Sequence, residues 1–193
     1  VTVPRSATPA PGNAGCTSTC SSFEGVSGPI NSPAVADIDN SGKLSVIVAS
    51  TAAVVTRFTI DPARSSASTF VFTKNWEHRY NQYQSFTTMD ATPIVADLLG
   101  NGQKEVIVAT EETGIFAVRP DGSTLWAQPL ASGHASPSVR DLDGDGRPEV
   151  VLANDDGVVY ALNGATGATK WTFNAGAYVW PAPVGHDHVH QRH

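Results

Sequence analysis

The 193-residue sequence contains only two cysteines, and its 12 lysines and arginines are outnumbered by 18 aspartates and glutamates. So few cysteines exclude a disulfide-rich framework. The formal net charge of −6, without a basic cluster, argues against a nucleic-acid surface. No run of apolar residues approaches the roughly 18 that a membrane-spanning helix needs. The sequence therefore indicates a domain with its own buried core, no nucleic-acid partner and no membrane span.

The two cysteines, Cys16 and Cys20, both lie in residues 1–28, a segment poor in aliphatic residues and rich in proline, serine, threonine and glycine. A C-x3-C pair without a second pair or nearby histidines is a poor zinc site, so a small local disulfide is the better interpretation. We therefore predict an N-terminal arm closed by a Cys16–Cys20 disulfide. Such a bridge favours an oxidising compartment, and we expect a secreted or cell-surface protein.

The 17 glycines and 13 prolines, with frequent valine and threonine, indicate an all-β protein of short strands and turns. From residue 29 onward the sequence repeats itself. Residues 32–39, 92–99 and 136–143 resemble one another, and each block is followed by a glycine-containing turn and an apolar strand. The starts of the blocks are 60 and 44 residues apart, and an insertion around residues 64–88 accounts for the longer interval.

The third repeat divides into four strand-like pieces, predicted at residues 137–142, 149–153, 157–162 and 169–173. Four strands in about 45 residues make one blade of a β-propeller. The sequence thus predicts propeller blades of four antiparallel strands over residues 29–184. The predicted blades are 29–78, 89–130 and 133–175, and a fourth begins at residue 178.

Three blades and one extra strand cannot close a ring, because small propellers need at least four blades. Either the sequence belongs to a longer chain, or copies assemble as a homo-oligomer through their incomplete blades. Trp76, Trp126 and Trp171 recur at the ends of the repeats, which favours packing between blades. Trp180 belongs to the incomplete fourth unit and is a candidate anchor for a partner or another copy.

An acidic loop in the third repeat points to calcium. Asp141, Asp143, Asp145 and Glu149 occupy relative positions 1, 3, 5 and 9, with glycines between them. A hard cation needs several oxygen ligands that converge while the backbone turns tightly, and the carbonyl group of Arg147 is a further candidate ligand. Apolar runs flank the loop on both sides, so we expect it to join two antiparallel strands. In the helix–loop–helix calcium motif the glutamate comes later, at position 12.

The equivalent loops of the first two repeats keep fewer of these ligands. The candidates are Asp37, Asp39 and Ser41 in the first loop and Asp97, Asn101 and Glu105 in the second. Ser45 stands at the glutamate position of the first loop, so fewer charged ligands should lower its affinity for Ca²⁺. Leu99 replaces the second aspartate of the second loop and cannot bind a cation. A structural turn without metal is the alternative there.

The repeated pattern S/T-P-x-V-x-D-x-D-x-x-G-x-x-E-V-V/I-V/L-A, followed by G-x-V/I-x-A-L/V and a closing tryptophan, resembles the FG-GAP/VCBS repeats of integrin-α-type β-propellers. The similarity covers residues 29–176. It implies a Ca²⁺-loaded propeller in a secreted or surface protein, with calcium between the first two strands of a blade. It also implies adhesion or carbohydrate binding, or a part in a polysaccharide-active enzyme. Residues 157–171 resemble quinoprotein-type propeller repeats as well, without implying a quinone cofactor.

Two further segments carry candidate ligand groups. Residues 78–83 mix polar and aromatic side chains, and Tyr80 and Tyr83 are candidates for stacking on sugar rings; the alternative is a loop that packs on its blade. Residues 185–193 contain four of the six histidines. This tail has the composition to bind transition metals, and the alternative is a cloning remnant.

No nucleophile, base and orienting group stand out as a catalytic set. Ser136 with His134 and Asp141 has the right residue types, but the serine belongs to the repeated S/T-P signature, which explains it structurally. We therefore expect an extracellular calcium-binding recognition or adhesion module for a carbohydrate or a protein partner. The alternative is a non-catalytic or partial portion of a secreted polysaccharide-degrading enzyme of propeller fold.

Overall fold

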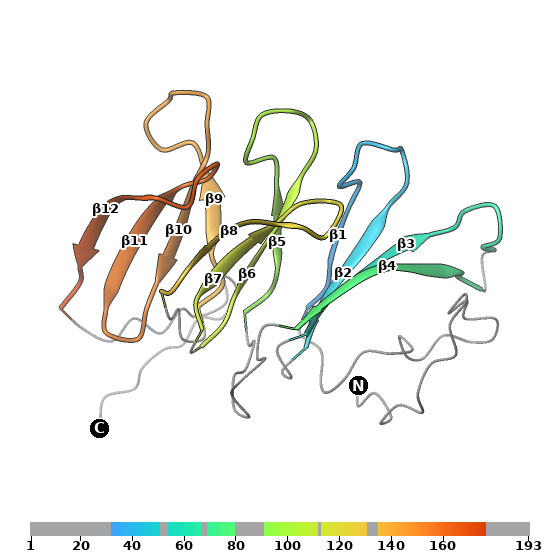
Figure 1. The fold of residues 1–193 in the computed structure, drawn as a ribbon, viewed down its shortest axis with the longest axis horizontal. Helices are drawn as coiled ribbons and strands as arrows, with labels where there is room; N and C mark the ends of the chain where they lie inside the picture. Colours follow the sequence, from blue (N-terminus) through green and yellow to red (C-terminus); the bar gives the residue numbers. More distant parts are fainter. Residues whose placement is uncertain are drawn as a thin grey trace, which may run out of the picture.

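The computed structural model describes residues 32–50, 54–66, 69–79, 91–111, 113–130 and 135–176 (Figure 1). Within these residues twelve strands form three four-stranded antiparallel sheets, which confirms the all-β prediction. The described residues include no helix able to cross a membrane. The strands are β1 (Ala34–Ala36), β2 (Ser45–Ser50), β3 (Val54–Ile60), β4 (Phe72–Arg79), β5 (Ile94–Ala96), β6 (Glu105–Ala109), β7 (Ile115–Val118), β8 (Thr124–Gln128), β9 (Ser138–Arg140), β10 (Glu149–Ala153), β11 (Val158–Asn163) and β12 (Thr169–Asn174).

Each sheet is one repeat of the sequence, and its strands follow one another in chain order. We call β1–β4 blade 1, β5–β8 blade 2 and β9–β12 blade 3. The blades stand side by side, and the loops between the first and second strands of all three project from the same edge (Figure 1). We call these loops 1, 2 and 3. All of the acidic repeats therefore lie along one edge of the molecule.

Side chains alternate between the two faces of each strand, and apolar side chains fill the space between neighbouring blades. Ile107, Ala117 and Trp126 are cross-strand partners on one face of blade 2, and they pack against Val150, Leu152 and Leu162 of blade 3. A second cluster joins blade 1 to blade 2 in the same way. Because each blade buries apolar side chains on its neighbour, the core is a series of inter-blade layers.

The pairing of the third and fourth strands is irregular at the same place in every blade. The register shifts at Arg57/Phe58, Ala117/Val118 and Ala161/Leu162. This leaves one extra residue on the fourth strand, directly before the tryptophan: Asn75, Leu125 and Lys170. A bulge of this kind re-aims the side chain of the extra residue.

The predicted tryptophan packing is confirmed between described blades. The Trp76 indole Nε1 donates a hydrogen bond to the carbonyl oxygen of Pro120 at 2.9 Å, and Trp126 donates to that of Gly164 at 2.7 Å. Each ring lies against a glycine of the next blade. A Cβ atom at Gly122 would come within 2.9 Å of the Trp76 side chain, and one at Gly167 within 2.7 Å of the Trp126 ring. Trp171, at the same position in blade 3, is 45% exposed.

Several predictions fall outside the described residues. These are the N-terminal arm with Cys16 and Cys20, the start of a fourth blade and the histidine-rich tail at 185–193. Within the described residues, the fourth strand of blade 1 spans Phe72–Arg79, inside the region 64–88 that is predicted as an insertion. Residues 78 and 79 therefore belong to the blade, paired with Val55 and Val54, rather than to an inserted loop.

Candidate metal centre

The acidic loops are folded by their own first aspartate. In loop 3, Asp141 Oδ1 accepts the amide N–H of Gly144 at 2.8 Å, and its Oδ2 accepts that of Gly146 at 2.9 Å. Both glycines have positive φ, 76° and 83°, a backbone conformation that glycine adopts without steric cost. The alternation of aspartate and glycine in the sequence thus has a local structural cause, separate from any metal.

The first aspartates of the other loops make the same bonds. In loop 2, Asp97 Oδ1 accepts from Gly100 at 2.6 Å and Oδ2 accepts from Gly102 at 2.8 Å. In loop 1, Asp37 Oδ2 accepts from Gly42 at 2.7 Å. These carboxylates stabilise tight turns in all three loops. What distinguishes the loops is therefore the set of the other charged groups around the turn.

Loop 3 alone, among the described residues, brings three carboxylates into one group. Ligand oxygens of Asp141, Asp143 and Glu149 all lie within 4.8 Å of one another, a spacing that can hold a metal ion. Glu149 is 1% exposed, and its Oε2 accepts the amide N–H of Leu142 at 2.9 Å. The predicted ligands Asp145 and Arg147 lie on the same loop, where Asp145 Oδ1 accepts the Arg147 amide N–H at 2.8 Å.

A lysine side chain contacts two of these carboxylates. The Lys170 Nζ donates to Asp143 Oδ2 at 2.5 Å and to Glu149 Oε1 at 2.8 Å. The pair of carboxylates raises the pKa of Lys170, and Lys170 lowers the pKa of Asp143. Lys170 is the extra residue of the β12 bulge, so the bulge gives its side chain a path to the loop. An ammonium group thus already supplies positive charge beside this cluster.

An arginine plays a related part in loop 1. The Arg57 guanidinium donates to Asp39 Oδ2 at 2.5 Å, to Ser45 Oγ at 3.0 Å and to the carbonyl oxygen of Pro120 in blade 2 at 2.7 Å. Its side chain is only 6% exposed. The Ser41 hydroxyl and the Arg57 guanidinium hold the pKa of Asp39 at about 2, below its ordinary value of 3.8.

Loop 2 has a buried acid instead. Glu105, the counterpart of Glu149, is 1% exposed, and its Oε2 accepts the Leu98 amide N–H at 2.9 Å. Burial raises the pKa of Glu105, because the charged form loses hydration there. Asn101 Oδ1 accepts the Gln103 amide N–H at 2.9 Å. No lysine or arginine in the described part of the chain forms a salt bridge with Glu105.

The sequence-based prediction gives no role to Arg57 or to Lys170. Arg57 had a signal: it is a charged residue inside the apolar strand VVTRFTI, where a buried charge needs a partner. Lys170 had none, since only the bulge brings it to loop 3. Tyr80, Tyr83 and Trp180 lie outside the described residues, so their proposed ligand contacts stay predictions.

The described residues support a structural role for Ser136. Its Oγ accepts the amide N–H of Thr92 at 2.9 Å, which links the start of blade 3 to the start of blade 2. His134 lies outside the described residues.

A mixed-charge depression of about 300 Å³ lies between loop 1 and blade 2, lined by Asp39, Arg57, Gln103, Arg119, Pro120 and Asp121. Arg57 already pairs Asp39 there.

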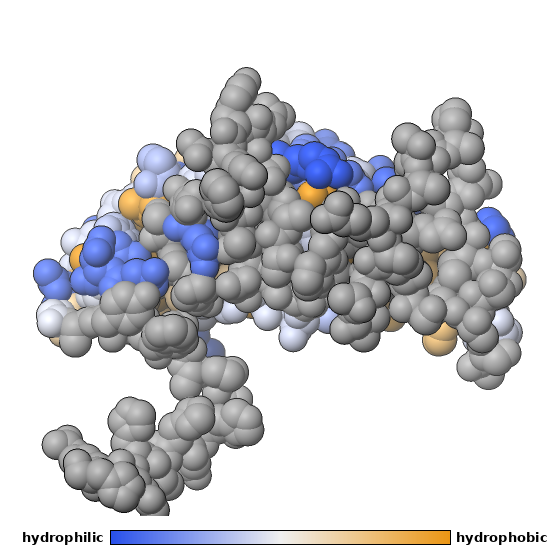
Figure 2. Space-filling view, turned by 90° about the horizontal axis from the view of Figure 1, so that it is seen from below, coloured by the Kyte–Doolittle hydropathy of each residue, from blue (hydrophilic) through white to orange (hydrophobic). Residues whose placement is uncertain are grey.

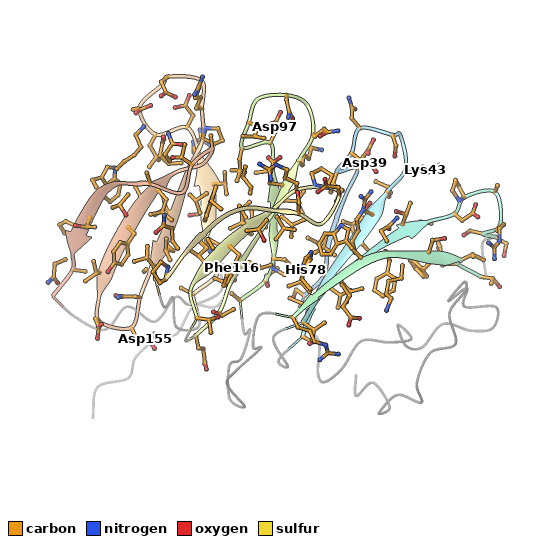
Figure 3. All side chains as sticks on the ribbon, viewed as in Figure 1. Asp39, Lys43, His78, Asp97, Phe116 and Asp155 are labelled. Atoms are coloured by element: carbon orange, nitrogen blue, oxygen red, sulfur yellow. The ribbon has the colours of Figure 1, made fainter. Side chains whose placement is uncertain are left out.

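The described edges differ in character. Asp39, Lys43 and Asp97 lie on the loop edge, whereas Asp155 lies on the opposite edge in the turn between β10 and β11 (Figure 3). Viewed from below, hydrophilic patches show on the side of blade 3, near the middle of the molecule and at the opposite end (Figure 2). The carboxylate cluster of loop 3 belongs to the loop edge, and Lys170 contacts it there.

Three antiparallel four-stranded blades packed side by side define a partial β-propeller. Residues 105–183 match the family model described as the lambda-carrageenase beta-propeller domain. No curated protein sequence matches the chain significantly.

Solved structures similar to this chain include BamB from Moraxella catarrhalis (23% identity, TM-score 0.48, 76% of this chain and 36% of that chain). The C-terminal WD40 domain of Sif2 is similar at 14% identity and a TM-score of 0.49, covering 68% and 33%. The V. cholerae biofilm matrix protein Bap1 is similar at 19% identity and a TM-score of 0.40, covering 74% and 28%. The chain thus spans about a third of the length of these structures.

Proposed function

We propose that this chain is a calcium-binding β-propeller portion of a secreted polysaccharide-degrading protein, and that its own part is to recognise the polysaccharide. The observation that carries the proposal is the match of residues 105–183 to a carrageenase propeller model. The match covers the last three strands of blade 2 and all of blade 3, which includes loop 3. Adhesion to a protein partner, the expectation from the FG-GAP/VCBS resemblance, has no comparable support. We keep the FG-GAP/VCBS resemblance as a proposal that accounts for the acidic loops.

The donor set of loop 3 fits a hard cation. Calcium takes six to eight oxygen ligands, and carboxylates are its preferred protein ligands. Asp141, Asp143 and Glu149 offer three carboxylates within 4.8 Å, and the Lys170 ammonium beside them is a stand-in for positive charge. In blade 1, Arg57 already occupies Asp39 and Ser45, so loop 1 favours a turn without metal. We propose loop 3 as the calcium site, with a structural role in tying β9 to β10.

The test is electrophoresis of the full chain through gels that contain lambda-carrageenan or the neutral polymer dextran, in CaCl₂ or in EDTA. We expect lambda-carrageenan, and not dextran, to slow the migration of the chain. The slowing should be weaker in EDTA than in CaCl₂. Calcium should also raise the melting temperature, because a ligand that binds only the folded state adds stability by mass action. An Asp141→Asn variant should lose the calcium shift.

The two parts of the proposal fail separately. Equal migration in all gels would contradict polysaccharide recognition, whatever the effect of calcium. An unchanged melting curve between CaCl₂ and EDTA would contradict the loop 3 site, whatever the migration. Reducing-end release from lambda-carrageenan by the purified chain would assign catalysis to it, where we expect recognition without turnover.

We also propose that a further blade of the same repeat covers the outer face of blade 3. The face carries Trp171 and Phe173, 45% and 61% exposed, and blades 1 and 2 use the position of Trp171 for contact with their successors. Each of those contacts uses a glycine turn, at Gly122 or Gly167. A second copy of this chain would offer residues 61–71 of its first blade, which contain no glycine. Homo-oligomerisation is therefore the less supported form of assembly.

Extending the chain at its carboxyl end with a second copy of residues 135–176 tests this assembly. We expect the added blade to shield Trp171, seen as reduced acrylamide quenching of tryptophan emission. The same extension with valine at the added copy of Gly167 is the control, since it leaves no room for a ring. Equal quenching of both chains would contradict a further blade. A stable dimer of the 193-residue chain by light scattering would support self-association instead.

A further inference from the structure

In two of the three acidic loops, a positively charged side chain from a strand of the same blade already contacts the carboxylates. Loop 1 has Arg57 against Asp39, and loop 3 has Lys170 against Asp143 and Glu149. We propose that Lys170 is a tethered cation that competes with the metal for loop 3, so that it sets the metal affinity of the site and leaves when metal binds. The inference rests on the proposed calcium site and concerns how that site is controlled.

The competition follows from shared ligands. Asp143 Oδ2 and Glu149 Oε1 accept hydrogen bonds from the Lys170 Nζ, and the same two residues belong to the cluster that can hold a metal. An oxygen that faces an ammonium at 2.5–2.8 Å cannot face a divalent cation from the same side. A cation bound beside the ammonium would also meet a like charge at close range. The two positive charges therefore exclude each other.

Lys170 has room to leave. It lies on β12, the outer strand of blade 3, all of whose residues are exposed. The lysine side chain is 28% exposed, and its partner Asp143 is 49% exposed. A lysine carries a single ammonium on a flexible four-carbon chain, so it can swing into solvent without breaking the strand. Its departure would cost one hydrogen bond to the exposed Asp143 and one to the buried Glu149, and the incoming cation takes the place of the ammonium at both carboxylates.

Arg57 shows the contrasting, locked arrangement. Its side chain is 6% exposed, and its three donor groups are used by Asp39, Ser45 and the carbonyl oxygen of Pro120 in the next blade. Releasing this guanidinium would take away a donor from the fully buried Ser45 and one of the two donors to the Pro120 carbonyl oxygen. Loop 1 is thus neutralised permanently, whereas loop 3 is neutralised by a group that a metal can displace.

Calorimetric titration of the metal-free full chain with CaCl₂ tests the competition. We expect Lys170→Met to bind Ca²⁺ about tenfold more tightly than the unmodified chain, or more, because a like charge no longer opposes the ion. Lys170→Arg keeps the charge and should not bind more tightly. Lys43→Met is the matched control: it removes an exposed lysine from loop 1 and alters net charge equally.

Thermal unfolding supplies a second readout with opposite signs. In EDTA, Lys170→Met should melt below the unmodified chain, because Asp143 and Glu149 lose their only cation among the described residues. In excess CaCl₂ the melting temperature of Lys170→Met should rise by more than that of the unmodified chain. A merely structural lysine would lower the melting temperature equally in both conditions.

The outcomes separate the inference from the site itself. Calcium binding of equal affinity to the unmodified chain and to Lys170→Met would overturn the competition while leaving the metal site in place. Binding to Lys170→Met alone would support it, with Lys170 as the dominant occupant. No binding to either chain, with both folded by circular dichroism, would overturn the metal site and the inference with it. Binding that survives Asp141→Asn in the Lys170→Met background would place the ion elsewhere and contradict both.

Discussion

Replacing Trp126 with alanine is expected to lower the free energy of unfolding by about 3–5 kcal/mol, the usual cost of deleting a buried tryptophan side chain. The ring is 7% exposed and packs with Leu152 and Leu162 of blade 3. The substitution also removes the Nε1 donor to the carbonyl oxygen of Gly164. Denaturant unfolding of the purified chain measures the loss.

Trp171 is the matched control for Trp126. It occupies the same position in blade 3, next to the same type of bulge, but it is 45% exposed. Trp171→Ala should therefore cost less than about 1 kcal/mol in the 193-residue chain, as do most exposed substitutions. Equal losses for both tryptophans would contradict the inter-blade role of Trp126.

Two glycines separate the ring contact from backbone strain. Gly167 and Gly176 have nearly the same φ, 72° and 69°, so alanine strains the backbone equally at both. Only at Gly167 does the added Cβ strike the Trp126 ring, at 2.7 Å, whereas nothing lies within 4 Å at Gly176. Gly167→Ala should be more destabilising than Gly176→Ala by about 1–3 kcal/mol, the usual cost of overpacking.

The blade architecture could be predicted because each strand repeats a local pattern. The predicted second strand of blade 3, at 149–153, coincides with β10, and the turns between strands carry glycines with positive φ. Period, turn chemistry and apolar alternation all act within a few residues, so they are readable without coordinates. The tryptophans also recur at a fixed place, and a fixed place in a repeat implies a fixed neighbour in the next repeat.

The charge balance of the loops was not predictable in the same way. The acidic spacing in loop 3 led to its carboxylates, and the structure brings three of them together. Lys170 is 21 residues from Glu149 in sequence, and its contact depends on a one-residue bulge at Ala161/Leu162. A register shift leaves no mark in composition or period. Side-chain partners set by such a shift require coordinates.

This difference changes how the acidic repeats are interpreted. From sequence, the spacing of the carboxylates predicts Ca²⁺ in loop 3, whereas loops 1 and 2 offer fewer charged ligands. In the structure, the carboxylate of the first aspartate accepts hydrogen bonds from backbone amides. Arg57 in loop 1 and Lys170 in loop 3 neutralise part of the remaining negative charge. The calcium proposal is therefore restricted to loop 3, where the resident cation is exposed enough to leave.

Replacing Arg57 with methionine is expected to destabilise the chain by about 2–4 kcal/mol, because it removes a buried guanidinium with three acceptors and leaves the half-buried Asp39 without its ion-pair partner. The guanidinium is 6% exposed and joins loop 1 to β2 and to blade 2 through three hydrogen bonds. The control is Arg64→Met, since Arg64 is 51% exposed and lies 3.8 Å from Asp61. An exposed pair of this kind contributes at most about 1 kcal/mol.

The pH dependence of unfolding identifies the pair. The pKa of Asp39 is held at about 2 in the folded chain, against an ordinary value of 3.8, so the folded state binds its proton less tightly than the unfolded state. The stabilisation is therefore complete above about pH 4 and is lost as the pH falls towards 2. Asp39→Asn should remove this part of the acid sensitivity, and combining it with Arg57→Met should cost less than the sum of the single losses. Additive losses, or an Arg57→Met variant as stable as Arg64→Met, would contradict an energetic coupling between Arg57 and Asp39 at the junction of blades 1 and 2.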